Sequence, residues 1–147
     1  MKKYEEYKDS GIEWLGEIPE HWSYTRIKHY SVSKTGSTPS RDIDEYWENG
    51  TIPWMSSGEI NQREITEISG RITKEAFENT SLTLFPKNTL MIAMNGQGKT
   101  KGIVGILKTE TTCNQSLTGF IFNKCINPKY VYYYLDSRYY DIRGLVS

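Results

Sequence analysis

The sequence has few of the residues that build metal sites or disulfide frameworks. Its 147 residues include two cysteines, Cys113 and Cys125, and two histidines, His21 and His29. These four residues form no spacing typical of metal ligands, and no set of nucleophile, base and acid is apparent in the sequence. A metal site is therefore not expected, and the cysteines are expected to stay reduced in a cytoplasmic protein.

The chain also lacks a net charge and a long apolar segment. Lys and Arg together number 18, and so do Asp and Glu, whereas domains that bind polyanions generically are usually markedly basic. No apolar run approaches the roughly eighteen residues of a membrane-spanning helix, and the N-terminus has no apolar signal core. A generic polyanion binder and a membrane protein are both disfavoured.

The charges that are present are distributed unevenly along the chain. Residues 99–147 carry seven basic against three acidic side chains, whereas residues 1–50 carry seven against ten. A positive region on a neutral body can contact phosphates, and the acidic region then faces elsewhere or contacts a protein. The alternative is a chance distribution of charges over a solvated surface.

Length and apolar patterning indicate one domain with several strands. A chain of this length corresponds to about one domain and can bury a sizeable core. Residues 89–94, 102–107 and 116–122 are apolar or β-branched runs of strand length. These runs predict three strands in the second half of the chain.

Two helices are expected between and after these strands. Thr73 can cap a short helix over residues 74–79, and Asn127 with Pro128 is a typical start for a helix over residues 129–143. Many strands with few helices favour an α+β fold. We expect a curved mixed or antiparallel, barrel-like β-sheet with a few short helices and a C-terminal helix.

The N-terminal segment, residues 1–22, alternates charged and aromatic residues without a clear period. Pro19 excludes a helix interior there. We expect an arm that packs on the body through Trp14, Leu15 and Trp22, within the single domain formed by the whole chain.

A glycine-rich stretch, NGQGKTKG over residues 95–102, resembles the end of a nucleotide-binding P-loop. A P-loop needs G-x-x-x-x-G-K-[ST] followed by a helix whose N-terminal amides hold the phosphates. Here Ala93 stands where the first glycine is required, and residues 102–105 favour a strand over a helix. ATP binding is therefore disfavoured, and no cofactor is expected.

The same stretch suits the tip of a β-hairpin. Its glycines permit positive φ, and its amide and lysine side chains can donate hydrogen bonds. Amides such as Asn95 and Gln97 can pair with adenine in a DNA groove, and lysines can contact guanine edges or phosphates. A solvated tight turn is the alternative.

A second short motif, NPKY from Asn127 to Tyr130, differs by one residue from the NPPY signature of amino-methyltransferases. It is more simply a helix start. The chain has neither the glycine-rich cofactor motif nor the length that a methyltransferase domain needs. We expect no enzymatic activity.

Several segments, taken in order along the chain, together form a recognisable set of family motifs. The most specific is the opening block, YKDSGIEWLG followed by IPEHW, within residues 7–22. The other matching stretches are GSTP at 36–39, YW at 46–47 with GTIPW at 50–54, GKTKG at 98–102, NQ at 114–115 and PKYVYYYL at 128–135. In this order the segments resemble the N-terminal target-recognition domain of the specificity subunit of type I restriction-modification systems. The likeness spans nearly the whole chain, which is taken as one domain, residues 1–147.

The resemblance implies a DNA-recognition protein without catalytic activity of its own. In the family, a specificity subunit carries two such domains separated by long helices, and each domain recognises one half of a bipartite target. Modification subunits bind S-adenosylmethionine and methylate adenine, and a restriction subunit supplies ATP-driven translocation and cleavage. This chain is expected to bind double-stranded DNA and these subunits, with the spacer helices and the second recognition domain absent from it.

Within this interpretation, the DNA-facing residues are expected on the glycine-rich stretch and on neighbouring polar loops. They are Ser37, Thr38, Arg41, Ser56, Ser57, Asn61, Gln62, Arg63, Asn95, Gln97, Lys99, Thr100, Lys101, Asn114 and Gln115. Tyr46, Trp47 and Trp54 are expected in the core, because burial is the commoner fate of such rings. Asn114 and Gln115 can equally brace loops by hydrogen bonds to the backbone.

Two other functions are consistent with the residues. One is a protein-interaction fragment, in which the aromatic arm and the acidic first third bind the modification subunit and DNA binding is negligible without that subunit. The other is a small nucleotide-binding enzyme built on the glycine-rich stretch, which the missing P-loop helix disfavours.

Overall fold

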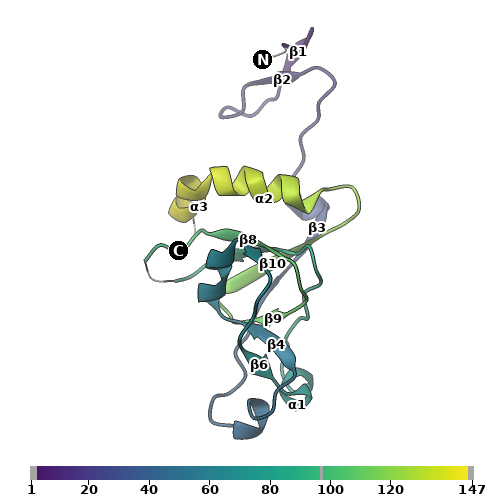
Figure 1. The fold of residues 1–147 in the computed structure, drawn as a ribbon. Helices are drawn as coiled ribbons and strands as arrows, with labels where there is room; N and C mark the ends of the chain where they lie inside the picture. The colour runs from purple at the N-terminus through teal and green to yellow at the C-terminus, as the bar shows by residue number, and fades with distance from the viewer. Residues whose placement is uncertain (1–2, 97, 146–147) are drawn as a thin grey trace.

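The computed structural model describes residues 3–96 and 98–145. Its body is built on a five-stranded sheet with the order β3-β10-β7-β8-β5 (Figure 1). The strands are β3 (Ser31–Thr35), β10 (Leu117–Phe122), β7 (Leu90–Ala93), β8 (Val104–Leu107) and β5 (Glu64–Ile65). β5 pairs with β8 in parallel, whereas the other neighbours pair antiparallel. The expected α+β fold with a mixed sheet is confirmed, and the sheet is open between its edge strands β3 and β5.

The three strands expected from apolar runs coincide with β7, β8 and β10. Every residue of β7 and β8 is buried, as expected for strands that have a neighbour on each side and covered faces. Their side chains pack with Phe85 and with Ile60 of the 3-10 helix η3 (Ser57–Gln62) in the main core. The sheet thus provides a rigid base for the loops at its ends.

A second sheet forms the lower end of the molecule in Figure 1. Its order is β6-β4-β9, with β6 (Arg71–Ile72), β4 (Ile52–Met55) and β9 (Thr112–Cys113). The 3-10 helix η2 (Asp44–Tyr46) and helix α1 (Lys74–Glu78) lie beside it. Thr73 caps α1 as expected, because its hydroxyl accepts a hydrogen bond from the Ala76 amide at 3.2 Å. Trp54 is buried here and Tyr46 and Trp47 pack on the same cluster, so the expected core position of these rings is confirmed.

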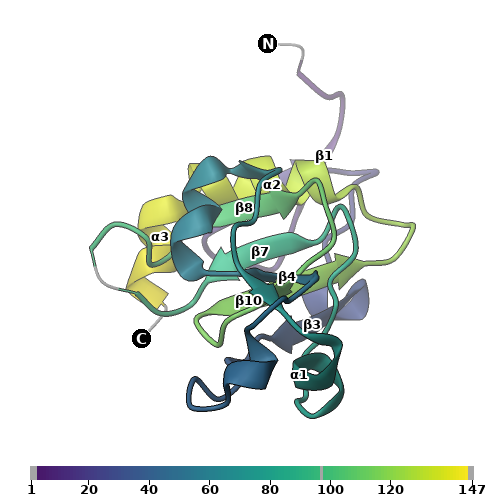
Figure 2. The same ribbon diagram turned by 60° about the horizontal axis from the view of Figure 1, so that its bottom comes forward.

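Two helices follow β10 and lie along one side of the main sheet (Figure 2). Helix α2 (Pro128–Ser137) begins as expected, because the Asn127 side chain accepts a hydrogen bond from the Lys129 amide at 3.0 Å. Tyr132 is buried from this helix against residues of β7 and β8. None of the helices in the described ranges has the length and apolarity needed to cross a bilayer.

The expected single helix over residues 129–143 is wrong. The helix is interrupted at Arg138, and a separate helix α3 (Tyr139–Leu145) follows. Helix α3 lies against the loop between β7 and β8, with which Tyr139 and Arg143 form hydrogen bonds. The local sequence favours helix on both sides, and these tertiary contacts accompany the change of direction.

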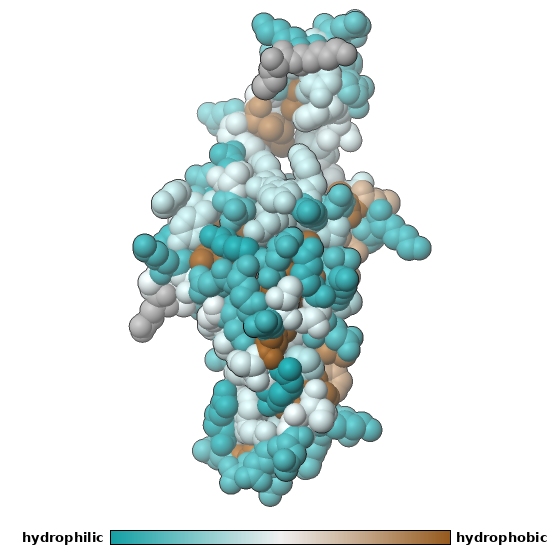
Figure 3. All heavy atoms as spheres, viewed as in Figure 1, coloured by the Kyte–Doolittle hydropathy of each residue, from teal (hydrophilic) through white to brown (hydrophobic). Residues whose placement is uncertain are grey.

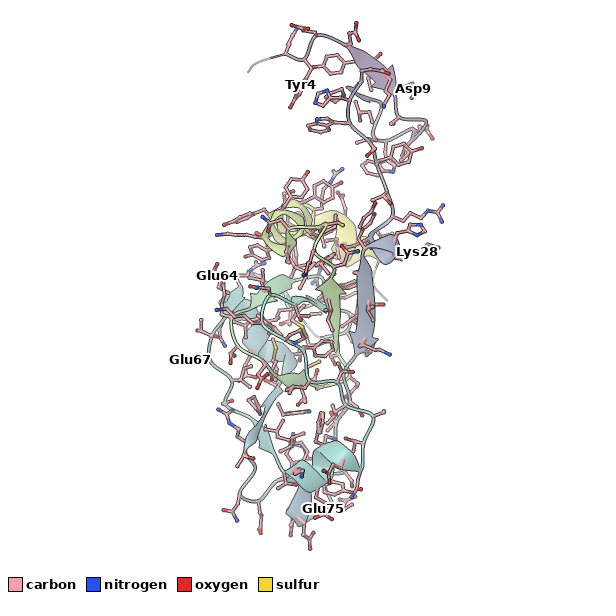
Figure 4. All side chains as sticks on the ribbon, turned by 90° about the vertical axis from the view of Figure 1, so that its right-hand side faces the viewer. Tyr4, Asp9, Lys28, Glu64, Glu67 and Glu75 are labelled. Carbon is pink, nitrogen blue, oxygen red and sulfur yellow. The ribbon has the colours of Figure 1, made fainter. Side chains whose placement is uncertain are left out.

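The N-terminal arm forms a small hairpin of its own. β1 (Tyr7–Asp9) pairs antiparallel with β2 (Glu17–Pro19), and the 3-10 helix η1 (Ile27–His29) leads into β3. Figure 1 shows this hairpin standing beyond α2, and Figure 3 shows a brown apolar patch within it on an otherwise mainly hydrophilic face. Figure 4 shows Tyr4 and Asp9 at the end of the arm that lies farther from the body than Lys28.

Aromatic residues of the arm make different contacts. Trp14 lies near α2 and α3, with the Arg138 guanidinium carbon 5.8 Å from its ring centroid. Trp22 instead packs on Tyr4 within the arm, with ring centroids 5.6 Å apart. Packing of the arm as a whole on the body stays a prediction.

Candidate nucleic-acid interface

The glycine-rich stretch is the connection between two antiparallel strands. β7 and β8 pair from Leu90 with Ile106 to Ile92 with Val104, and residues 94–103 join them. Strand β8, not a helix, follows this stretch, so the expected hairpin geometry is confirmed. We call residues 94–103 the glycine loop; Gln97 lies outside the described residues.

Three glycines of the loop adopt conformations that other residues rarely adopt. Gly96, Gly98 and Gly102 have φ values of 152°, 66° and 84°, in a range that costs a residue with a Cβ atom free energy. The base of the loop is closed by a hydrogen bond from the Gly102 amide to the Ala93 carbonyl at 2.9 Å. The described residues of the loop leave the sheet at the left of Figure 2.

Lys99 and Lys101 have no ion-pair partner among the residues that the structure describes. Lys99 is exposed and Lys101 is half-buried. Two other basic residues of the last third are paired: Lys108 with Glu64 at 3.3 Å and Arg138 with Asp141 at 3.2 Å. Lys124, Lys129 and Arg143 likewise have no ion-pair partner among the described residues, so the glycine loop carries two of the five cations of this region whose charge no acidic side chain neutralises.

Three carbonyl groups of the loop accept hydrogen bonds from helix α3. The Tyr139 hydroxyl donates to the Lys99 carbonyl at 2.7 Å, and Arg143 donates to the carbonyls of Gly98 and Lys101 at 2.6 and 3.0 Å. Sequence reasoning missed both side chains. Their partners are 40 to 45 positions away, so no local pattern identifies these contacts.

A second loop, residues 36–41, meets the turn at Asn114 and Gln115. The Thr38 hydroxyl donates to the side-chain oxygen of Gln115 at 2.5 Å, and the Ser37 amide donates to the Cys113 carbonyl at 2.9 Å. The backbones also touch at Gly36, where a Cβ atom would lie 2.2 Å from that same carbonyl oxygen.

Two tryptophan side chains donate hydrogen bonds to the backbone of the 36–41 loop. The indole N–H of Trp54 donates to the Ser37 carbonyl at 3.0 Å, and that of Trp47 donates to the Ser40 carbonyl at 2.8 Å. The guanidinium carbon of Arg41 lies 3.6 Å from the centroid of the Trp47 ring, a cation–π arrangement that restricts its motion. The two rings thus belong to the core and also support an exposed polar loop.

The turn at residues 114–116 connects the two loops. The Ser116 carbonyl accepts hydrogen bonds from the amides of Met94 and Asn95, at 2.9 and 3.4 Å. The Ser116 amide in turn donates to the Asn114 side chain at 3.1 Å, and the Asn114 amide donates to the Met55 carbonyl, next to Ser56. The structure thereby brings the glycine loop, the 36–41 loop and Asn114–Gln115 into one set of contacting loops.

The side chains of residues 61–63 instead form hydrogen bonds or an ion pair within the protein. The side-chain amide of Asn61 donates to the Gly58 carbonyl at 2.8 Å, and the Gln62 side chain forms hydrogen bonds with backbone groups at residues 66–67. Arg63 forms an ion pair with Asp136 of α2 at 2.5 Å. A DNA contact of these three side chains stays a prediction, and it would compete with these bonds.

Ser56 and Ser57 lie at the start of η3, where Glu59 closes a capping box. Its carboxylate accepts hydrogen bonds from the Ser56 amide at 2.8 Å and from the Ser69 amide and hydroxyl at 2.8 and 2.9 Å. Burial acts to raise the pKa of Glu59, but these hydrogen bonds outweigh it and hold the pKa below the ordinary 4.5. Glu59 is therefore a structural acid that stabilises the loop bearing the two serines.

The net pKa shift has the opposite sign at Cys113, where burial outweighs the hydrogen bond. Desolvation raises the pKa of its thiol to about 12, so the side chain stays neutral and unreactive at ordinary pH. Within residues 3–96 and 98–145, no group of three or more His, Cys, Asp or Glu side chains is placed to hold a metal ion.

Comparison with known proteins identifies the family. Residues 19–143 match the model of the type I restriction modification DNA specificity domain. The chain is 33% identical over 136 residues to the type I restriction enzyme MjaIX specificity subunit of Methanocaldococcus jannaschii, which covers 90% of this chain and 30% of the relative. It is 31% identical over 139 residues to the type I restriction enzyme EcoR124I/EcoR124II specificity subunit of Escherichia coli. That alignment covers 92% of this chain and 31% of the relative.

Solved structures agree with this in fold. The HsdS subunit from Thermoanaerobacter tengcongensis superposes with a TM-score of 0.66 at 12% identity, over 93% of this chain and 32% of that one. A structure of a type I R-M system, described in terms of complex assembly and conformational transition, gives a TM-score of 0.67 at 12% identity, with the same coverage. Likeness at this level of identity concerns the fold alone.

The molecule is thus an α+β domain whose sheet carries a set of contacting polar loops. It belongs to the family of type I restriction modification DNA specificity domains. The chain spans about 30% of the length of the curated relatives that it matches. The resemblance found in the sequence is confirmed.

Proposed function

We propose that this domain recognises one half of a bipartite DNA target and directs a type I restriction-modification complex to it. The observation that carries the proposal is the glycine loop, a hairpin connection with two lysines that have no ion-pair partner among the described residues. Lysines on such a loop contact phosphates, and neighbouring amide side chains contact base edges. Membership of the DNA specificity domain family supports the same interpretation.

The proposal divides the contacting loops by chemistry. Lys99 and Lys101 neutralise phosphates, which fixes the position of the domain on the duplex without selecting a sequence. Arg41, Asn95 and Gln115 have the guanidinium and amide groups that pair with guanine or adenine in the major groove. Sequence selectivity is therefore assigned to the second group.

No catalytic step is assigned to this chain. Methylation of adenine belongs to modification subunits, and translocation and cleavage belong to a restriction subunit. An adenine extruded from the duplex enters a pocket of the modification subunit. The role of this domain is to set where on the DNA those subunits act.

A selection from random duplex DNA at several salt concentrations tests the proposal. If three to four phosphates are contacted, the logarithm of the binding constant falls with the logarithm of salt at a slope near −3, from roughly −0.9 per phosphate. Selection should also enrich one short sequence. Absence of binding to any duplex, or binding that does not depend on salt, would contradict the proposal.

A second candidate function is binding to a modification subunit, with little DNA binding by this chain alone. It is favoured by the aromatic side chains exposed on the helices and the arm: Tyr130, Tyr133 and Tyr140 are exposed, and Trp14 is 66% exposed. Tyrosine and tryptophan are enriched at protein interfaces. Size-exclusion chromatography with the modification subunit, with and without DNA, separates the two functions, because only the second gives co-elution without DNA and no binding to DNA alone.

A further inference from the structure

The glycine loop is held to helix α3 by two side chains that lie one helical turn apart. Tyr139 donates to the Lys99 carbonyl at 2.7 Å, and the two terminal nitrogens of Arg143 donate to the carbonyls of Lys101 and Gly98 at 3.0 and 2.6 Å. The first of these nitrogens also lies 3.2 Å from the Tyr139 hydroxyl. Three carbonyls within four residues of the loop are thereby bonded to one helix.

The backbone of α3 also packs directly against the loop. A Cβ atom at Gly102 would lie 3.0 Å from the Arg143 Cα atom and 3.1 Å from its Cβ atom. Only a glycine permits this distance without displacement, and its φ of 84° is also typical of glycine. Two features therefore make the contact: α3 contributes the side chains that donate hydrogen bonds, and the loop contributes a glycine that lets the two backbones approach each other.

These hydrogen bonds restrict the backbone conformations that the glycines of the loop can adopt. Gly96, Gly98 and Gly102 each have many accessible backbone conformations, and ordering them costs conformational entropy. A guanidinium group has a rigid planar fork, so two carbonyls bound to it are fixed relative to each other. We call the hydrogen bonds from Tyr139 and Arg143 to the loop carbonyls the clamp. Without the clamp, the lysines would retain their charge but lose a defined position.

We infer that Tyr139 and Arg143 are positioning residues, which set the conformation of the glycine loop for recognition of a particular DNA sequence. This inference rests on the proposed function. Three of the five N–H groups of Arg143 are used by two loop carbonyls and the Tyr139 hydroxyl, so we assign its contribution to DNA binding to loop geometry, and a phosphate contact is the alternative that the test distinguishes. Loss of the clamp should reduce selectivity between DNA sequences and leave the sequence-independent attraction to phosphates.

Conservative variants of the full 147-residue chain test this role. R143K retains the charge but lacks the fork, and Y139F retains the ring but lacks the hydroxyl. R138K and Y140F are matched controls, because Arg138 pairs with Asp141 and Tyr140 is 85% exposed. Hydrogen exchange of the Gly102 and Ile103 amides, which donate to the carbonyls of Ala93 and Thr100, measures loop order. Binding to the selected duplex and to a random duplex measures selectivity.

We expect R143K and Y139F to accelerate exchange of the Gly102 and Ile103 amides by about five- to thirtyfold, the effect of losing one or two net hydrogen bonds. Affinity for the selected duplex should fall by a similar factor, whereas affinity for random duplex and the salt slope should change less than about twofold. The matched controls should leave all of these values as in the unaltered chain.

Three results would overturn the inference. Unchanged loop exchange in both variants removes the positioning role, and so does an unchanged ratio of selected to random affinity. An equal loss on both duplexes with a salt slope flattened by about one makes Arg143 a phosphate contact instead. If the unaltered chain binds no duplex, the proposed function fails, and the exchange of the Gly102 and Ile103 amides still decides whether α3 orders the loop.

Discussion

Replacing Lys99 and Lys101 together by alanine should flatten the salt dependence of DNA binding. Neither side chain has an ion-pair partner among the described residues, so no internal attraction has to be broken before each binds a phosphate. Each phosphate contact contributes roughly −0.9 to the slope of log K against log salt. Removal of both lysines should therefore change a slope of about −3 to about −1.2.

The change is large enough to measure by fluorescence anisotropy with a labelled duplex. Between 50 and 200 mM salt, a slope of about −3 corresponds to a roughly 60-fold loss of affinity, and a slope of about −1.2 to a roughly fivefold loss. The fold itself should be unaffected, because Lys99 and Lys101 contact α3 through their carbonyls, which alanine retains.

The matched control is the double replacement of Lys124 and Lys129 by alanine. It removes the same charge from the same third of the chain, but from the turn before α2 and from its first turn. Helix α2 has ten residues and is about 15 Å long, and α3 begins only after its far end. If overall charge alone determines binding, both double variants will flatten the slope equally. That result, or an unchanged slope in the Lys99 and Lys101 variant, would refute a specific phosphate contact of the glycine loop.

Three further predictions concern the supporting contacts. Thr38→Val, which loses the hydrogen bond to Gln115, should alter the preferred base at one position of the selected sequence, and Thr38→Ser should restore it. Because the pKa of Glu59 is lowered in the folded state, its contribution to stability is complete above the unfolded-state pKa and is lost as pH falls through the folded-state value. Denaturation midpoints should consequently decline less below about pH 4.5 in Glu59→Gln than in the unaltered chain, and an equal decline would show that other carboxylates dominate. A thiol reagent should modify only exposed Cys125 in the native protein, because the pKa of buried Cys113 is raised to about 12; two modified thiols without denaturant would contradict that burial.

The sequence pattern alone determined those strands and helix caps whose determining residues lie close together in the chain. The apolar runs before and after the glycine loop gave β7 and β8, because a run of buried side chains of strand length has few other solutions in a small domain. Caps at Thr73 and Asn127 were predicted for the same reason, since a cap and the amide that it accepts from lie within three residues. The choice of a hairpin over a P-loop also depended on the four residues after Lys101.

The tertiary structure alone decided which distant residues meet. The clamp of Arg143 on the loop, the bond from Thr38 to Gln115 and the ion pair of Arg63 with Asp136 join positions 42 to 77 residues apart. No periodicity encodes such a pair, because each side chain alone is an ordinary polar residue of a helix or loop. The interruption at Arg138 has the same origin: local preference favours one continuous helix, and contacts between α3 and the glycine loop accompany a different path. Local chemistry thus specified the strands and caps, whereas the packing of the whole chain specified how its loops are held together.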